Sequence, residues 1–211
     1  MPSPEIKICG ICEATALEAA IGARADFVGF VFHAASPRHL LPGAAAALAA
    51  RAGQRIARVG LFVDAGDAAI AEAVTAAQLD ILQLHGQETP ARAAELAARF
   101  GLPVWKAIAV ASRDDVTRAN AYAGAAARIL FDAKTPGGAL PGGMGLAFDW
   151  SLLAGWTGRA WGLAGGLSPA NVGEALRLTG APLVDCSSGV ESAPGVKDAA
   201  LIAGFCAAAR G

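Results

Sequence analysis

The feature that most constrains this chain is a regular alternation of short apolar runs with longer helical stretches along all 211 residues. Such alternation is typical of parallel βαβ units. Strands buried on both faces are nearly continuous apolar runs, as in residues 27–32. The chain contains about eight of these units, whereas an open flavodoxin-like sheet needs only about five strands. We therefore predict an α/β protein that forms a single (β/α)8 TIM barrel over residues 1–211, without a linker.

The apolar runs and the residues that begin and end helices give approximate bounds for each element. Pro is favoured in the first turn of a helix, and Ser and Thr are favoured just before it. The predicted strands are residues 6–9, 27–32, 56–63, 81–84, 104–109, 128–131, 160–164 and 183–186. The predicted helices are residues 13–22, 41–50, 67–77, 90–100, a segment opened by Ser112, 148–153, a segment opened by Ser168-Pro169, and 197–209.

Two turns rich in glycine and serine follow the last two predicted strands. The first contains Gly165 and Gly166, and the second contains Ser187, Ser188 and Gly189. Glycine lets the backbone approach an anion closely and offer it N–H groups. TIM barrels often bind phosphate in the loops after strands seven and eight. The pair of turns therefore predicts a phosphate site, although either turn alone is also compatible with an ordinary loop.

Reactive side chains stand at the C-terminal ends of the predicted strands, where TIM-barrel enzymes have their active sites. Cys9 ends the first strand, and Arg38 follows the second. Gln83 and His85 end the fourth strand, and Asp132 ends the sixth. A thiol, a guanidinium, an imidazole and a carboxylate together suit proton transfer on a charged substrate. Each also has a purely structural interpretation, as a buried thiol, a solvated arginine or a turn-capping aspartate.

The inward-facing residues of the first and last strands are expected to contact one another. Side chains two residues apart share a face of a strand, so Lys7 lies one layer below Cys9, and Asp185 one layer below Ser187. The first and eighth strands are neighbours in a closed barrel, so Lys7 and Asp185 are expected to meet inside it. A lysine below Cys9 is also expected to favour the thiolate, which is the form that acts as a base.

Two motifs allow other interpretations. Cys9-Gly10-Ile11-Cys12 has the spacing of a redox motif, and we keep open both a Cys9–Cys12 disulfide formed on oxidation and a Cys12 that packs under the first helix. A thioredoxin-like domain does not account for the later βα units. The glycine-rich residues 137–145 lack the Gly-Lys-Ser/Thr ending of a P-loop, and we predict that they form a mobile active-site lid.

Composition argues against several classes of protein. The formal net charge of −1 does not indicate a nucleic-acid partner, and no apolar run approaches the ~18 residues that span a membrane. The N-terminal residues do not resemble a secretory signal. Four cysteines in 211 residues do not suggest a disulfide scaffold. We expect a cytoplasmic protein, monomeric or homodimeric, with no nucleic-acid or membrane partner.

Taken together, several segments resemble the phosphoribosylanthranilate isomerase family of tryptophan biosynthesis. Each segment alone is weakly specific, but together they extend over nearly the whole chain in the order found in the family. They are residues 7–10 (Lys-Ile-Cys-Gly), 26–32, 36–38 (Ser-Pro-Arg), 59–63, 82–86 (Leu-Gln-Leu-His-Gly), 131–132 with 142–145 and 148–150, 164–167 with Asn171, and 184–191 with 195–198.

The resemblance implies a (β/α)8 barrel that catalyses an Amadori rearrangement without a cofactor or metal. The phosphosugar substrate N-(5-phospho-β-D-ribosyl)anthranilate would become 1-(2-carboxyphenylamino)-1-deoxy-D-ribulose 5-phosphate. By matching motif, Cys9 would be the general base and Asp132 the general acid. Arg38 would pair with the anthranilate carboxylate, and the two turns would hold the phosphate. The remaining predicted substrate-binding residues are Gln83, His85 and Asp185.

Two other classes of function stay open at this point. One is another phosphosugar barrel: a ribulose-phosphate epimerase would show metal-binding His and Asp residues at its strand ends. An indole-glycerol-phosphate synthase would need glutamates at the barrel mouth and a catalytic lysine, for which Lys7 and Lys106 are candidates. The other class is a non-catalytic barrel that binds phosphate or senses redox state, and it would bind ligand without turnover. Met144, where the family more often has a small residue, bears on loop packing only.

Overall fold

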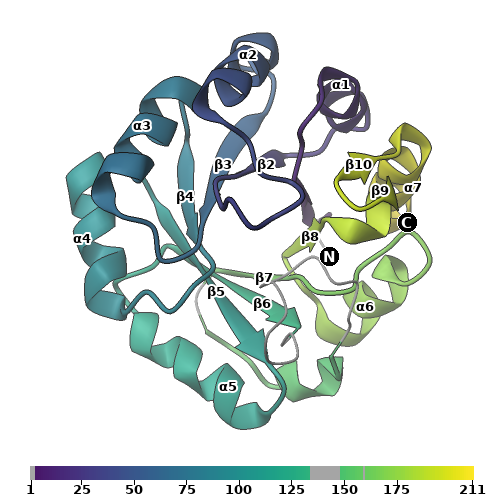
Figure 1. Cartoon of the computed structure of the whole chain (residues 1–211). Coiled ribbons are helices and arrows are strands. Elements are labelled where there is room, and N and C mark those ends of the chain that lie inside the picture. The colour runs from purple at the N-terminus through teal and green to yellow at the C-terminus, as the bar shows by residue number, and fades with distance from the viewer. Residues whose placement is uncertain (1–2, 134–147, 159) are drawn as a thin grey trace.

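The chain folds into a closed barrel of eight parallel strands, in which β8 pairs with β1. The computed structural model describes residues 3–133, 148–158 and 160–211. Figure 1 shows the helices arranged around the strands, and the predicted (β/α)8 TIM barrel is confirmed. The strands are β1 (Glu5–Cys9), β2 (Phe27–Val31), β3 (Ala57–Phe62), β4 (Ile81–Leu84), β5 (Val104–Val110), β6 (Arg128–Ala133), β7 (Trp161–Leu163) and β8 (Leu183–Cys186).

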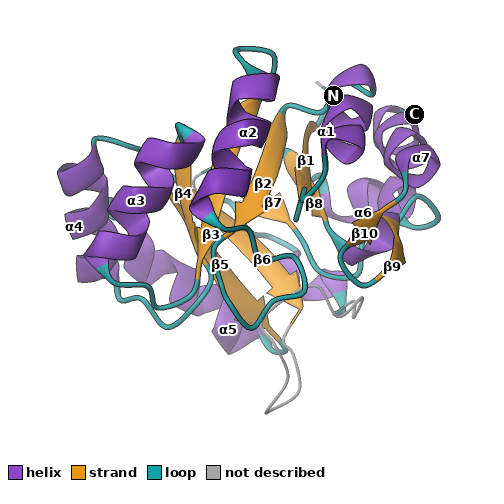
Figure 2. Cartoon of the chain, turned by 45° about the horizontal axis from the view of Figure 1, so that its top comes forward, coloured by secondary structure: helices purple, strands orange, loops and turns teal. Residues whose placement is uncertain are grey.

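Helices cover the outside of the barrel (Figure 2). The α-helices are α1 (Ala14–Gly22), α2 (Pro42–Ala52), α3 (Asp67–Ala77), α4 (Pro90–Phe100), α5 (Arg113–Arg118), α6 (Val172–Thr179) and α7 (Ala199–Arg210). Local sequence explains where two of these helices begin. Before α4, the Thr89 side chain accepts a hydrogen bond from Arg92 N, and at the start of α5, Ser112 and Asp115 form a reciprocal capping box. Among the described helices, none is long and apolar enough to cross a membrane.

Side chains that alternate along the strands fill the barrel interior. A lower cluster includes Val59, Trp105 and Leu183, and an upper cluster contains Cys9, Val31 and Leu61. The larger remaining core lies between the strands and the helices. Alternation therefore determines which polar side chains enter the barrel and which face the helices.

Lys106 illustrates this alternation, because its neighbours Trp105 and Ala107 both belong to the interior cluster. The Lys106 side chain consequently points towards the helices, where its Nζ contacts Glu88 Oε2 at 2.9 Å and Gly86 O at 2.6 Å. Lys106 is thus committed to a buried ion pair outside the barrel interior, and it is a poor candidate for the catalytic lysine of a synthase.

The helix predicted to start at Ser168-Pro169 begins later than expected. The α6 helix starts at Val172, after a turn that the Asn171 side chain holds together. Asn171 Oδ1 accepts a hydrogen bond from Ser168 N at 2.8 Å, and its Nδ2 donates to Gly166 O at 2.9 Å. These bonds close a turn that immediately precedes the helix.

The predictions for residues 148–153 and 197–209 were also partly wrong. The predicted short helix is present, but it covers only Trp150–Leu153 and is a 3-10 helix. A hairpin that was not predicted, β9 (Glu191–Ala193) and β10 (Val196–Lys197), precedes α7. Lys197 therefore belongs to a strand, and α7 starts at Ala199, where Asp198 Oδ1 accepts hydrogen bonds from the N–H groups of the first turn.

Candidate active site

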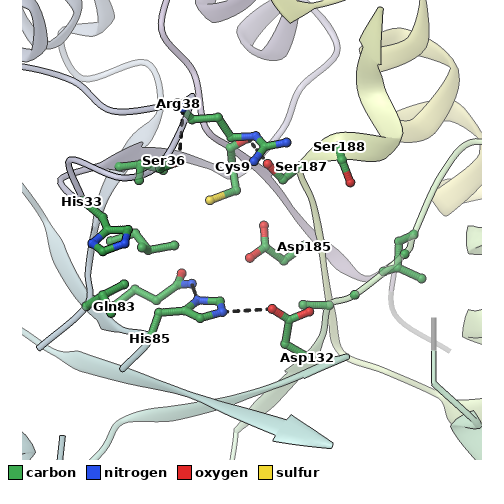
Figure 3. Close-up of a pocket in the computed structure, with 17 residues that line it drawn as sticks. Cys9, His33, Ser36, Arg38, Gln83, His85, Asp132, Asp185, Ser187 and Ser188 are labelled. Atoms are coloured by element: carbon green, nitrogen blue, oxygen red, sulfur yellow. Dashed lines mark hydrogen bonds and ion pairs between the residues drawn. The ribbon is translucent and has the colours of Figure 1, made fainter. Parts of the chain in front are cut away.

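Nearly all the predicted site residues line one cavity at the C-terminal ends of the strands (Figure 3). Gly189 differs, because it packs behind the cavity: a side chain there would lie 1.9 Å from Leu167 O. The two turns after β7 and β8 are thus packed backbone to backbone. The predicted site residues that line the cavity are Cys9, Arg38, Gln83, His85, Asp132, Gly165, Gly166, Asp185, Ser187 and Ser188.

Lys7 and Asp185 form the predicted contact across the closure of the barrel. They are paired in register on β1 and β8, and Lys7 Nζ lies 2.8 Å from Asp185 Oδ2. The Lys7 side chain is 0% exposed and that of Asp185 is 7% exposed. The ion pair therefore lies inside the barrel, below the Cys9 thiol.

The pKa of Cys9 is the outcome of opposing effects. Burial raises the pKa of the Cys9 thiol, the charge of Lys7 lowers it, and the charge of Asp185 raises it. Burial has the largest effect, so the net pKa is raised. The expectation that Lys7 favours the thiolate agrees with the direction of the Lys7 effect, which burial outweighs.

Asp132 is held in place by two contacts at the end of β6. His85 Nε2 lies 3.0 Å from Asp132 Oδ2, and Ala133 N donates to Asp132 Oδ1 at 2.8 Å. Gln83 Nε2 lies 3.3 Å from His85 Nδ1. When Gln83 donates to Nδ1, the hydrogen of a neutral His85 is on Nε2 and points at Asp132. A chain of three polar side chains thus orients the carboxylate (Figure 3).

Two hydrogen-bond acceptors of the cavity have no partner within the described residues. They are Gln83 Oε1 and Asp185 Oδ1, and both atoms are buried. Gln83 is 1% exposed, so solvent access to its amide is small. Buried acceptors are usually satisfied, and each exception needs a donor from elsewhere. These two acceptors suit hydroxyl or N–H groups of a ligand.

Arg38 reaches the cavity from the loop after β2 and is held by a carboxylate that the sequence analysis did not single out. Its Nε and Nη2 each lie 2.7 Å from an oxygen of Glu191, in a two-point ion pair. Glu191 also accepts a hydrogen bond from Lys197 Nζ at 2.7 Å. Glu191 and Lys197 are on the β9–β10 hairpin, which has no clear apolar alternation. Neither residue was predicted to belong to the site: Glu191 and Lys197 lay in a segment that resembles the family, and Lys197 also began a predicted helix.

The turns after β7 and β8 bring small residues to the cavity. Gly165 and Gly166 have positive φ values of 81° and 64°. A side chain at Gly165 would also lie 2.4 Å from Ala133 N and 2.8 Å from Asp132 Oδ1, so only glycine fits beside Asp132. Ser187 and Ser188, in the neighbouring turn after β8, line the same cavity. Backbone and hydroxyl groups from two loops therefore face one space.

Cys12 packs against the backbone. Its Sγ contacts Arg38 O at 3.3 Å, and Cys9 and Cys12 are both free thiols. A disulfide between them stays a prediction. The predicted lid at residues 137–145, with Met144, lies outside the described residues. Among the residues that the structure describes, no cluster of three or more His, Cys, Asp or Glu could hold a metal ion.

Comparison with known proteins identifies the family. Residues 6–208 match the family model described as N-(5′-phosphoribosyl)anthranilate (PRA) isomerase. The chain belongs to the phosphoribosylanthranilate isomerase family. It is 56% identical over 206 residues to N-(5′-phosphoribosyl)anthranilate isomerase of Paracoccus denitrificans, covering 97% of this chain and 96% of that one. The protein of that name from Paramagnetospirillum magneticum is 51% identical over 212 residues, covering 98% and 97%.

Solved structures agree with this membership of the phosphoribosylanthranilate isomerase family. The enzyme from Thermotoga maritima superimposes with a TM-score of 0.88 at 36% identity, covering 98% of each chain. A phosphoribosylanthranilate isomerase in complex with reduced 1-(o-carboxyphenylamino)-1-deoxyribulose 5-phosphate superimposes with a TM-score of 0.86 at 34% identity, again covering 98% of each chain. The chain is therefore an isomerase of tryptophan biosynthesis, as the resemblance implied.

Proposed function

We propose that Cys9 and Asp132 perform the proton transfers of the Amadori rearrangement of N-(5-phosphoribosyl)anthranilate. One observation supports this most directly: a buried thiol and a hydrogen-bonded carboxylate face the same cavity, with the open acceptor of Asp185 also directed into it. The reaction needs one acid and one base on a bound sugar, and no redox change.

Asp132 serves as the general acid in the first step, which its carboxyl group enters in the protonated form. It donates a proton to the ring oxygen of the ribose, the bond between that oxygen and C1′ breaks, and the anthranilate nitrogen forms a protonated Schiff base with C1′. His85 contacts Asp132 at 3.0 Å, which holds the carboxyl group in position during this step. Acid catalysis of this kind contributes about 10²–10⁴-fold.

Cys9 serves as the general base in the second step. The thiolate takes the proton from C2′, and the electrons of the C–H bond form a C1′–C2′ double bond that neutralises the Schiff base. The resulting enolamine tautomerises to the ketone of the product. Burial disfavours the thiolate in the empty site, but the positive charge of the Schiff base, together with Lys7, favours it when the substrate is bound.

The remaining residues hold the substrate between acid and base. The open acceptors Asp185 Oδ1 and Gln83 Oε1 bind sugar hydroxyl groups. The Gly165-Gly166 and Ser187-Ser188 turns bind the phosphate, and Arg38 binds the anthranilate carboxylate. Fixing both ends of the substrate keeps C2′ near Cys9 and the ring oxygen near Asp132.

Turnover of the fluorescent substrate tests this proposal. Purified protein is incubated with phosphoribosylanthranilate, and loss of substrate fluorescence is followed. Cys9→Ser and Asp132→Asn are each expected to lower kcat by about 10²-fold or more. Matched controls are Cys206→Ala in α7 and the exposed Asp114→Asn in α5, which leave kcat unchanged. Near-normal kcat in Cys9→Ser or Asp132→Asn, with an unchanged fold by circular dichroism, would remove that residue from the mechanism.

We also propose where the protein acts and how many copies assemble. We expect the protein to act in the cytoplasm as a monomer or homodimer on a phosphosugar substrate. One Thermotoga maritima relative is described as monomers generated from a dimeric isomerase. Light scattering coupled to size-exclusion chromatography measures the state of assembly directly.

A further inference from the structure

Three charged side chains form a buried group beside the cavity, which we name the Arg38–Glu191–Lys197 cluster. Glu191 Oε1 accepts hydrogen bonds from Arg38 Nε and from Lys197 Nζ, both at 2.7 Å. Glu191 Oε2 accepts one from Arg38 Nη2 at 2.7 Å. The side chains of Arg38, Glu191 and Lys197 are 9%, 4% and 1% exposed. One carboxylate is therefore shared by two cations that are almost completely withdrawn from water.

The cluster carries one net positive charge, because it contains two cations and one anion. Within the described residues, the neighbouring pair of Lys7 and Asp185 is balanced, so it adds no net charge to the cluster. A charge withdrawn from water is costly unless an opposite charge accompanies it. A ligand anion next to Arg38 would complete a balanced group of two cations and two anions.

Arg38 and Lys197 lie at different positions, and their roles therefore differ. Arg38 lines the cavity, so its guanidinium can contact the ligand. Lys197 stands behind the turn after β8, where its Nζ lies 2.9 Å from Ser187 O and 3.3 Å from Ser187 Oγ. Burial lowers the pKa of Lys197, and Glu191 opposes that effect. Glu191 thus helps Lys197 to stay charged while it also orients Arg38.

We propose that Glu191 and Lys197 are positioning residues for recognition of the substrate carboxylate. Glu191 fixes the orientation of Arg38 but cancels its charge, and Lys197 restores that charge without touching the substrate. This inference rests on the proposed function, in which Arg38 meets the anthranilate carboxylate. Without Lys197, Arg38 and Glu191 form a neutral pair that attracts a carboxylate weakly.

Charge-changing variants test the proposal, with anthranilate and inorganic phosphate as competing probes. Lys197→Met makes the cluster neutral, so the inhibition constant of anthranilate and the KM of the substrate are each expected to rise about 10-fold or more. The kcat is expected to stay within about 3-fold, because neither Cys9 nor Asp132 changes. The double variant E191Q/K197M restores the charge of +1 and keeps an acceptor for Arg38, so anthranilate binding is expected to return to within about 3-fold of normal.

The decisive measurement is whether E191Q/K197M binds anthranilate more tightly or more weakly than K197M. A purely structural role predicts that E191Q/K197M binds anthranilate more weakly than K197M, and that result overturns the proposal. A loss of phosphate binding in K197M without loss of anthranilate binding also overturns it, because the cluster would then serve the phosphate end. If K197M does not fold, anthranilate binding by E191Q/K197M is compared with binding by the normal enzyme. Binding within about 3-fold of normal supports the proposal, and weaker binding overturns it. Failure of the proposed function would instead appear as lack of turnover in the normal enzyme.

Discussion

Removal of Lys7 is expected to destabilise the barrel strongly, because Asp185 would be left buried and unpaired. In the structure Lys7 Nζ is the partner of Asp185 Oδ2 at 2.8 Å, and Asp185 Oδ1 has no partner within the described residues. Lys7→Met therefore leaves both carboxylate oxygens unsatisfied, at a site where Lys7 is 0% and Asp185 7% exposed.

The size of the effect follows from the burial of the pair. Breaking a buried ion pair by removing one partner costs about 3–5 kcal/mol. For a chain of 211 residues, each kcal/mol lowers Tm by about 2–4 °C, so Lys7→Met is expected to lower Tm by roughly 6–20 °C. Replacing both partners, in Lys7→Met with Asp185→Leu, removes the unpaired charge and is expected to recover most of this loss.

Differential scanning calorimetry and urea denaturation measure the effect in all three proteins. Activity should behave differently from stability: the double variant regains Tm but stays impaired, because Cys9 has lost the Lys7 charge and the substrate has lost the Asp185 acceptor. If Lys7→Met lies within about 0.5 kcal/mol of the normal protein, or if the double variant is less stable than Lys7→Met, the reasoning from the buried pair is refuted.

Three further predictions concern the cysteines and Arg38. Because burial raises the pKa of Cys9 above its ordinary value of 9.0, the thiolate fraction grows with pH throughout the neutral range, and kcat/KM is expected to rise without reaching a plateau below pH 9.0; a plateau near pH 7 would contradict this. Arg38→Lys is expected to raise KM more than it lowers kcat, since lysine cannot imitate the two-point pair; equal binding by the normal enzyme of analogues with and without the ortho carboxylate would contradict that assignment. If Cys9 and Cys12 form a disulfide, mild oxidant abolishes activity and dithiothreitol restores it; fully inactivated enzyme without a Cys9–Cys12 linkage by mass spectrometry would rule the disulfide out.

Sequence alone determined the barrel and the identity of most residues that line its cavity. The spacing of apolar residues in strands and helices is a local property of the sequence. Eight short apolar runs separated by helical stretches were therefore sufficient to predict the closed barrel. Alternation along β1 and β8 placed Lys7 with Cys9 and Asp185 with Ser187. The closure of the barrel then made the contact between Lys7 and Asp185 predictable, and the structure confirms it at 2.8 Å.

Tertiary structure alone decided the charge environment of the site. The pKa of Cys9 is a sum of burial and of charges from different strands, and no local pattern gives the balance between them. Glu191 and Lys197 lie on a short polar hairpin without apolar alternation, so their contacts with the Arg38 side chain depend on how the chain after β8 folds back against the loop after β2. Asn171 likewise closes the turn before α6 through hydrogen bonds to Gly166 and Ser168. Periodicity predicts which face a side chain occupies, whereas partners and charges depend on distances between residues far apart in the sequence.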